Sequence, residues 1–245
     1  MFSLHFQSIF EYKSRAFVWF LIALLNPLIV LLFWYASHLS GNRIAGWGID
    51  ALVGYYLIQI ILRAMLWAHP GEEVALLDIQ EGNLLKYLLK PSSYFLYKLF
   101  EDLPWRILQA VFGIIIVSVL YFIFGIRLKV NSEAQQFLWV FLICVNAYTL
   151  SYLYDMILGF SAFLLTDYRG LQQVSEVLFI ILAGTVMPLS LFPQLLKTIS
   201  FQLPYAYMLY FPILAVQGAL TNSEIISVII MQFAWMGVLV VVCKF

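Results

Sequence analysis

The sequence predicts an all-α integral membrane protein with six transmembrane helices, and two observations carry this prediction. Hydrophobic residues make up 64% of the 245-residue chain and charged residues only 11%, whereas soluble domains contain roughly 45–50% apolar and about 25% charged residues. Uncharged runs that approach the roughly 20 residues of a membrane helix recur along the whole chain. The formal net charge is zero, so nothing indicates nucleic-acid binding.

The apolar runs set the limits of the expected spans. The first run, Ala16 to Ser37, has 22 residues, more than the roughly 7–15 of a secretory signal, so we interpret it as a retained span. Arg63 interrupts the second run, and Pro188 and Pro193 cut the fifth one short. The single expected domain, residues 1–245, therefore has spans at 17–37, 51–68, 106–126, 136–163, 174–187 and 225–243.

A seventh apolar run, residues 198–223, contains Pro204 and Pro212. Proline removes a backbone donor and clashes with the preceding turn, so two prolines break a helix into pieces. Broken backbone at membrane depth persists only where protein or water satisfies its polar groups. We therefore expect residues 188–220 to form short re-entrant helices, with Gly184 just before them.

The basic residues predict the orientation. With six spans and both termini cytoplasmic, nine Lys and Arg residues lie on the inner side and four on the outer side, as the positive-inside rule requires. Residues 1–15 place Phe2, Phe6 and Phe10 at helical spacing, which predicts an amphipathic helix in the inner interface. A plain flanking segment is the alternative.

The longest hydrophilic stretch, residues 70–104, is expected to form a structured cytoplasmic coupling region. We predict three short helices in it, at 72–82, 83–89 and 92–103. The acids near the start favour a helix N-terminus, Gly82 can end the first helix, and Lys90–Pro91 and Leu103–Pro104 end the other two. A second inner loop, 166–176, is short and charged. We expect both loops to contact a partner protein; a loop that packs only on its own bundle is the alternative. The expected contact residues are Glu72, Glu73, Asp78, Glu81 and Gly82 in the first loop and Asp167 and Arg169 in the second.

Two ionisable residues, Arg63 and Asp155, fall within span sequences. Charges in a bilayer are costly and are usually paired or functional. We hypothesise that the two approach one another at the inner-leaflet level; separate snorkelling and a transport relay are alternatives. An ion-coupled carrier normally has several membrane acids or matching broken helices in its two halves, and this sequence has neither.

No catalytic motif is present. The chain lacks G-x-x-x-x-G-K-[ST] and H-E-x-x-H, so neither an ATP-binding P-loop nor a zinc-protease site is expected. Cys144 and Cys243 lie in apolar runs, which favours buried free thiols. We expect a non-catalytic chain with no metal and no cofactor of its own.

The second half resembles the membrane subunit of a type-2 ABC (ATP-binding cassette) exporter. The matching pattern, G-F-x-A-F … G … P-L … F-P … L-P … P … G, consists of Gly159, Phe160, Ala162, Phe163, Gly184, Pro188, Leu189, Phe192, Pro193, Leu203, Pro204, Pro212 and Gly218. The string from Glu81 to Leu85, followed by Leu88 to Pro91, is similar to the family's cytoplasmic loop.

This resemblance implies two permease subunits, identical or different, joined to two ATPase subunits that bind ATP and Mg²⁺. It places the coupling helix at residues 72–82, an interfacial helix at the N-terminus and the dimer seam at the first and fifth spans. It also leads us to expect a bacterial plasma (inner) membrane and a basic tail, which the sequence ending at Phe245 lacks. The alternative functions are an ion-coupled carrier acting alone and a scaffold for a secretion or pilus machine. The substrate is not indicated.

Overall fold

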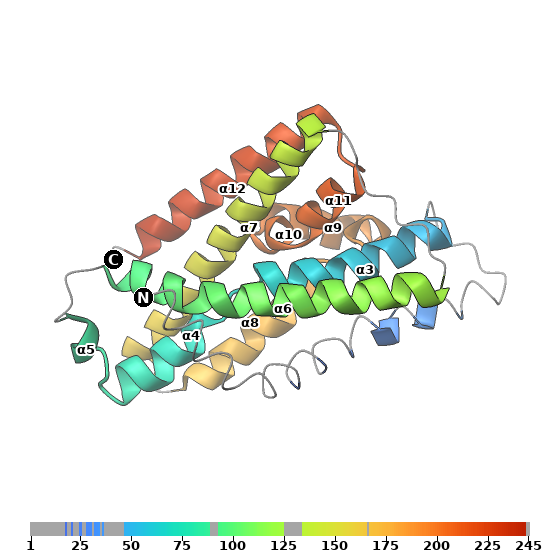
Figure 1. The fold of residues 1–245 in the computed structure, drawn as a ribbon. Coiled ribbons are helices and arrows are strands. Elements are labelled where there is room, and N and C mark those ends of the chain that lie inside the picture. The colour runs from blue at the N-terminus through green and yellow to red at the C-terminus, as the bar shows by residue number, and fades with distance from the viewer. Residues whose placement is uncertain are drawn as a thin grey trace.

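The computed structural model describes residues 47–88, 93–124, 134–165 and 167–243, with scattered positions between Val18 and Ala36. All regular elements in the described residues are helical (Figure 1), which confirms the all-α fold class. The expected interfacial helix at 1–15 and most of the span at 17–37 lie outside the described residues.

Four helical stretches of the described chain are long and apolar enough to cross a membrane: Ile49–Gln80, Tyr94–Phe122, Phe137–Phe163 and Asn222–Val242. They correspond mainly to the helices α3 (Ile49–Leu66), α6 (Tyr94–Phe124), α7 (Ala134–Phe160) and α12 (Asn222–Val242). Large apolar side chains such as Phe122, Phe141 and Ile230 remain exposed on their surfaces. Exposed faces of this kind suit a hydrocarbon surrounding.

Helix α3 forms the centre of the bundle. It is buried on all sides from Leu52 to Ile60 and packs against α6 and α11, while α12 packs along α7 (Figure 1). A helix that is apolar all round is suited to such a buried position. The main core cluster joins α3 to α7, α8, α10, α11 and α12.

A short, irregular segment follows α3. It consists of α4 (Pro70–Glu73), the π-helix η1 (Val74–Gln80) and Gly82, whose φ of +78° is left-handed as expected. We call residues 70–82 the π segment. It continues into α5 (Leu85–Leu88).

Helix α6 corrects one prediction. We expected a short helix to stop at Leu103–Pro104, but α6 continues through Pro104 without a break. Arg106 donates hydrogen bonds of 2.9–3.1 Å to Asp102 across this turn, and Tyr148 from α7 donates to the same carboxylate at 2.9 Å. These contacts on both sides of the proline offset the lost backbone bond.

Helix α8 (Tyr168–Leu182) begins where a loop was expected at 166–176 and ends before Gly184, which has a φ of +75°. The chain then forms η3 (Leu189–Leu191), α9 (Gln194–Gln202), α10 (Tyr205–Met208) and α11 (Tyr210–Gln217). We call residues 183–221 the broken segment. A capping box between Thr221 and Glu224 then starts α12.

Candidate functional site

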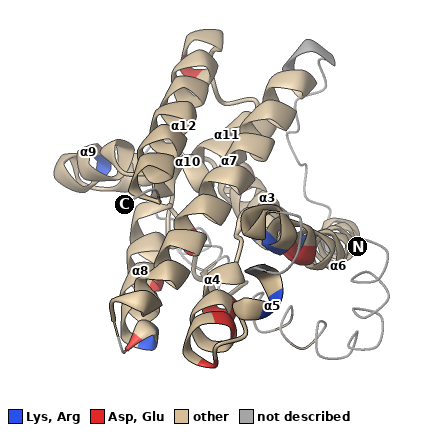
Figure 2. Ribbon diagram, turned by 90° about the vertical axis from the view of Figure 1, so that its left-hand side faces the viewer, with Lys and Arg blue, Asp and Glu red and all other residues tan. Residues whose placement is uncertain are grey.

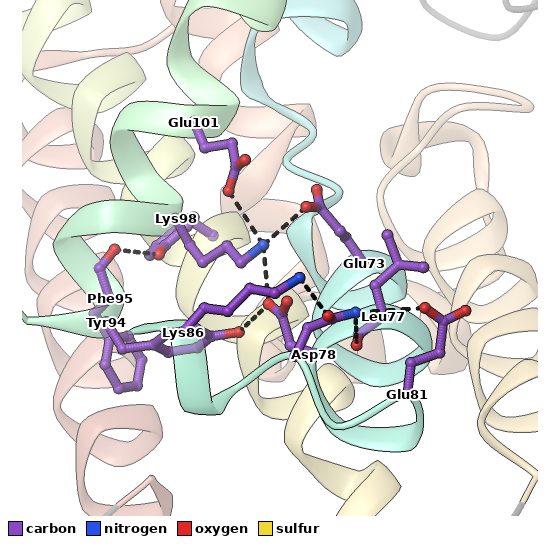
Figure 3. A network of polar contacts seen from close by, with 11 residues as sticks. Glu73, Leu77, Asp78, Glu81, Lys86, Tyr94, Phe95, Lys98 and Glu101 are labelled. Carbon is purple, nitrogen blue, oxygen red and sulfur yellow. Dashed lines mark hydrogen bonds and ion pairs between the residues drawn. The ribbon is translucent and has the colours of Figure 1, made fainter. Parts of the chain in front are cut away.

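The π segment is held from one side by Lys98 of α6. The Lys98 side chain is only 1% exposed, and its Nζ lies 2.9 Å from Glu73 Oε1, 2.9 Å from Asp78 Oδ2 and 3.1 Å from Glu101 Oε2 (Figure 3). One buried ammonium therefore joins the α4 end, the π-helix and α6. A buried charge is stable only when such partners surround it.

Tyr94 strengthens this anchor. Its hydroxyl donates a 2.6 Å hydrogen bond to Asp78 Oδ2 (Figure 3). With these partners, Asp78 is buried, with a side-chain exposure of 3%. The sequence predicted Asp78 as a contact for another protein; instead, its carboxylate faces inward and is not accessible in this structure.

A second anchor joins the π segment to α7. The Gly71 amide donates a 2.6 Å hydrogen bond to Asp155 Oδ2. The packing is close, because a Cβ on Gly71 would lie 2.3 Å from the Asp155 carbonyl oxygen, and one on Gly159 would lie 2.8 Å from the Gly71 carbonyl oxygen. Both positions therefore require glycine for a steric reason, and α4 lies directly on the α7 backbone.

The hypothesis that Arg63 and Asp155 form a pair is wrong. Both residues are described, and no ion pair joins them. Asp155 binds the Gly71 amide instead, and the carboxylate whose charge acts on Arg63 is that of Glu176, on α8. The sequence could not show this arrangement, because a backbone amide carries no sequence signal.

The opposite face of the π segment is free of these contacts. Glu72, Leu77, Glu81 and Gly82 are exposed there. Glu73, which binds Lys98, is also partly exposed. Figure 2 looks onto this end of the molecule and shows acidic positions on α4 and charged positions on α5 and at the start of α8. The exposed face thus combines acidic groups with an apolar side chain.

The second predicted contact loop lies beside the first. Asp167 and Arg169 are exposed at the start of α8, where the Asp167 carboxylate accepts a 3.1 Å hydrogen bond from the Gly170 amide. Between them, Tyr168 is buried, and α8 contacts α4. Burial raises the pKa of the Tyr168 phenol well above its ordinary value, and the nearby charges of Asp155 and Glu72 raise this pKa further.

The broken segment is attached to α3 by neutral side chains. Tyr55 and Tyr56 each donate a 2.7 Å hydrogen bond, to the Gly184 and Val186 carbonyl oxygens, and Gln59 donates at 3.2 Å to the Thr185 carbonyl. Three consecutive carbonyl groups that no longer belong to a helix are thereby satisfied. The polar residues inside an otherwise apolar α3 were the available sequence signal.

The prolines expected to break this segment lie at its turns. Pro188 precedes η3, Pro193 precedes α9 and Pro204 precedes α10, each at the position before the helix begins. Pro212 lies within the first turn of α11. At these positions the missing amide of proline removes no interior helical bond.

In the part of the chain that the structure describes, no group of three or more His, Cys, Asp or Glu side chains is placed to hold a metal ion. The buried charged residues Lys98, Asp102 and Asp155 instead form contacts between neighbouring elements.

The long apolar helices of the described residues define a multi-pass membrane protein. Residues 24–245 match the family described as ABC-2 family transporter protein, and the chain belongs to this family. Its members are membrane components of permease type, and the family implies an ABC transporter with ATPase partners. No curated protein and no solved structure matches the chain.

Proposed function

We propose that the chain is the permease subunit of an ABC exporter, which moves an unidentified substrate with ATP hydrolysed by a separate subunit. ATP and Mg²⁺ would be bound by that partner. The observation that carries this proposal is the π segment. One face of it is exposed and acidic, while the other is fixed to α6 and α7 by the buried contacts of Lys98 and Asp155. A partner that moves this segment would move both helices.

The proposed topology has six spans with both termini on the inner face. Figure 1 supports it, because α3, α7 and α12 run toward the end that carries α4 and α5, whereas α6 runs away from it. Helix α8 starts beside α4 and would be the main part of a fifth span. Helices α9 to α11 would be re-entrant, and residues 17–37 would be the first span.

The exposed face also indicates the chemistry of the partner surface. Glu72 and Glu81 are acidic, and Leu77, 43% exposed, lies between them in the sequence. We expect the ATPase to present an apolar groove with basic residues along its rim, since opposite charges steer association and fix register. Arg169 at the start of α8 would lie at the edge of this contact.

The two alternative functions are less well supported. A proton-coupled carrier needs a membrane acid that is free to exchange protons, but Asp155 is engaged by the Gly71 amide and packed against it. A pure scaffold would need no exposed segment that is anchored to two long helices. The proposed complex contains a second permease subunit, identical to this chain or different from it.

Co-purification tests the proposal. The chain, expressed with its candidate P-loop ATPase, should retain the ATPase in detergent, and vanadate should block substrate movement. Glu72→Lys combined with Glu81→Lys should abolish retention. Asp50→Lys, a reversal of an exposed acid on the first turn of α3, is the matched control and should retain the ATPase. Equal retention by all variants would contradict the proposed contact.

A further inference from the structure

The π-helix in the π segment is an uncommon element that needs an explanation. Residues Val74–Gln80 form it, and the Glu81 amide closes it with a 3.2 Å hydrogen bond to the Leu76 carbonyl, five residues back. π-helices occur mostly as single turns and frequently at functional sites. The local sequence, V-A-L-L-D-I-Q, contains neither glycine nor proline, so it does not exclude an ordinary α-helix.

Lys98 contacts two carboxylates whose spacing matches this helix type. Glu73 and Asp78 are five residues apart, and both lie 2.9 Å from the same Nζ. On an α-helix, residues five apart are turned about 140° past a full turn, which places them on different faces. In a π-helix the hydrogen bonds close over five residues and the turn is wider, so residues five apart lie much closer to one face than they do on an α-helix.

We propose that Lys98 is a positioning residue that fixes the π-helical register of the π segment. One ammonium can hold both Glu73 and Asp78 only in this register, and Tyr94 further restrains Asp78 through its 2.6 Å hydrogen bond. An α-helical register would carry one of the two carboxylates away from Lys98. The buried Lys98 would then lose a partner, which makes this register unfavourable.

The register decides which residues face a partner, and this step rests on the proposed function. Glu72 and Leu77 are also five residues apart and are both exposed, whereas Leu76 is partly buried. In an α-helical register Leu76, four residues after Glu72, would take the place of Leu77. Lys98 thereby selects an acidic and apolar face made of Glu72 and Leu77.

Cysteine accessibility tests the register without any ATPase. Leu76→Cys and Leu77→Cys are made separately in the full chain with Cys144 and Cys243 replaced by alanine, and the purified proteins are placed in lipid nanodiscs. A water-soluble maleimide should label position 77 faster than position 76. In the Lys98→Met background the order of the two rates should reverse, and in the Lys98→Arg background it should be kept.

The ratio of the rates separates positioning from simple stabilisation. If both positions label faster in Lys98→Met with their order unchanged, Lys98 stabilises the segment without setting its register, and the proposal is wrong. Glu73→Gln provides a milder variant, because this side chain is 41% exposed; it should lower the ratio of labelling at 77 to that at 76. An unchanged ratio in Glu73→Gln would also overturn the proposal, whatever the result of the ATPase experiment.

Discussion

The π segment and the broken segment both depart from regular α-helix, but different chemistry holds them. The π segment is fixed by an ionic cluster, in which Lys98 lies between carboxylates, and by the Asp155 side chain, which accepts a hydrogen bond from a backbone amide. The broken segment is fixed by uncharged donors, the Tyr55 and Tyr56 hydroxyls and the Gln59 side-chain amide, which bind three consecutive carbonyl groups. Neutral donors cost less to bury than charges do, so they suit a region surrounded by apolar helices.

This difference shows how one bundle can contain a fixed part and a driven part. Charged contacts are strong and directional, yet Glu73 remains partly exposed, so a partner can approach and alter them. Tyr55 and Tyr56, whose hydroxyls on α3 hold the broken segment, belong to the main core cluster. We infer that the π segment receives mechanical input, whereas the broken segment keeps its shape.

The largest expected effect is at Lys98. Lys98→Met leaves Glu73, Asp78 and Glu101 without their shared cation, and removing one partner of a buried ionic group costs about 3–5 kcal/mol. Lys86→Met, at an exposed lysine, should change stability by less than about 0.5 kcal/mol. Thermal unfolding in detergent compares the two variants. Equal midpoints would show that the charged anchor contributes little.

The next effect is steric. Gly71→Ala and Gly159→Ala each force a Cβ to within 3 Å of backbone atoms, and overpacking of this kind costs about 1–3 kcal/mol. Gly237→Ala is the control, because a Cβ there meets nothing within 4 Å. The unfolding midpoint should fall for the first two variants only. A normal midpoint for Gly71→Ala would mean that α4 can move away from α7 at little cost.

The neutral contacts should give smaller effects. Tyr55→Phe and Tyr56→Phe each remove one donor from a carbonyl oxygen, which costs about 0.5–1.5 kcal/mol and about 0.6 kcal/mol for the average membrane hydrogen bond. Tyr121→Phe, at an exposed ring, is the control and should leave the unfolding midpoint unchanged in the same assay. If these variants lowered the unfolding midpoint as much as Lys98→Met does, the proposed difference in contact strength between the two segments would be wrong.

The smallest effect on stability is expected for Glu72→Lys with Glu81→Lys. Both side chains are exposed, so the unfolding midpoint should stay within the change of about 0.5 kcal/mol typical of surface substitutions. Retention of the ATPase should nevertheless be lost. If the double variant unfolds early, the loss of retention would reflect folding and not contact.

The sequence predicted the helical class because uncharged runs and helix-breaking residues act locally. The prolines at 188, 193 and 204 each precede a helix, and Gly82 adopts the left-handed conformation expected for a helix end. These features need no knowledge of distant partners.

The sequence could not predict features that depend on tertiary contacts. The π-helix is matched to Lys98, which is 20 residues beyond Asp78 in the chain and on another helix. The burial of Asp78 has the same cause, and Pro104 is tolerated because Arg106, Asp102 and Tyr148 support that turn. The partner of Asp155 is a glycine amide, which any residue but proline would provide.

Photo-crosslinking most directly tests whether the π segment, and not the broken segment, meets the ATPase. A photoreactive phenylalanine analogue is placed at Leu77 in the π segment or at Leu195 on α9, which is 73% exposed. In membranes that contain both subunits, illumination should join position 77 to the ATPase and leave position 195 without an ATPase adduct. An ATPase adduct from position 195, or none from position 77, would contradict the assignment of the π segment as the input surface.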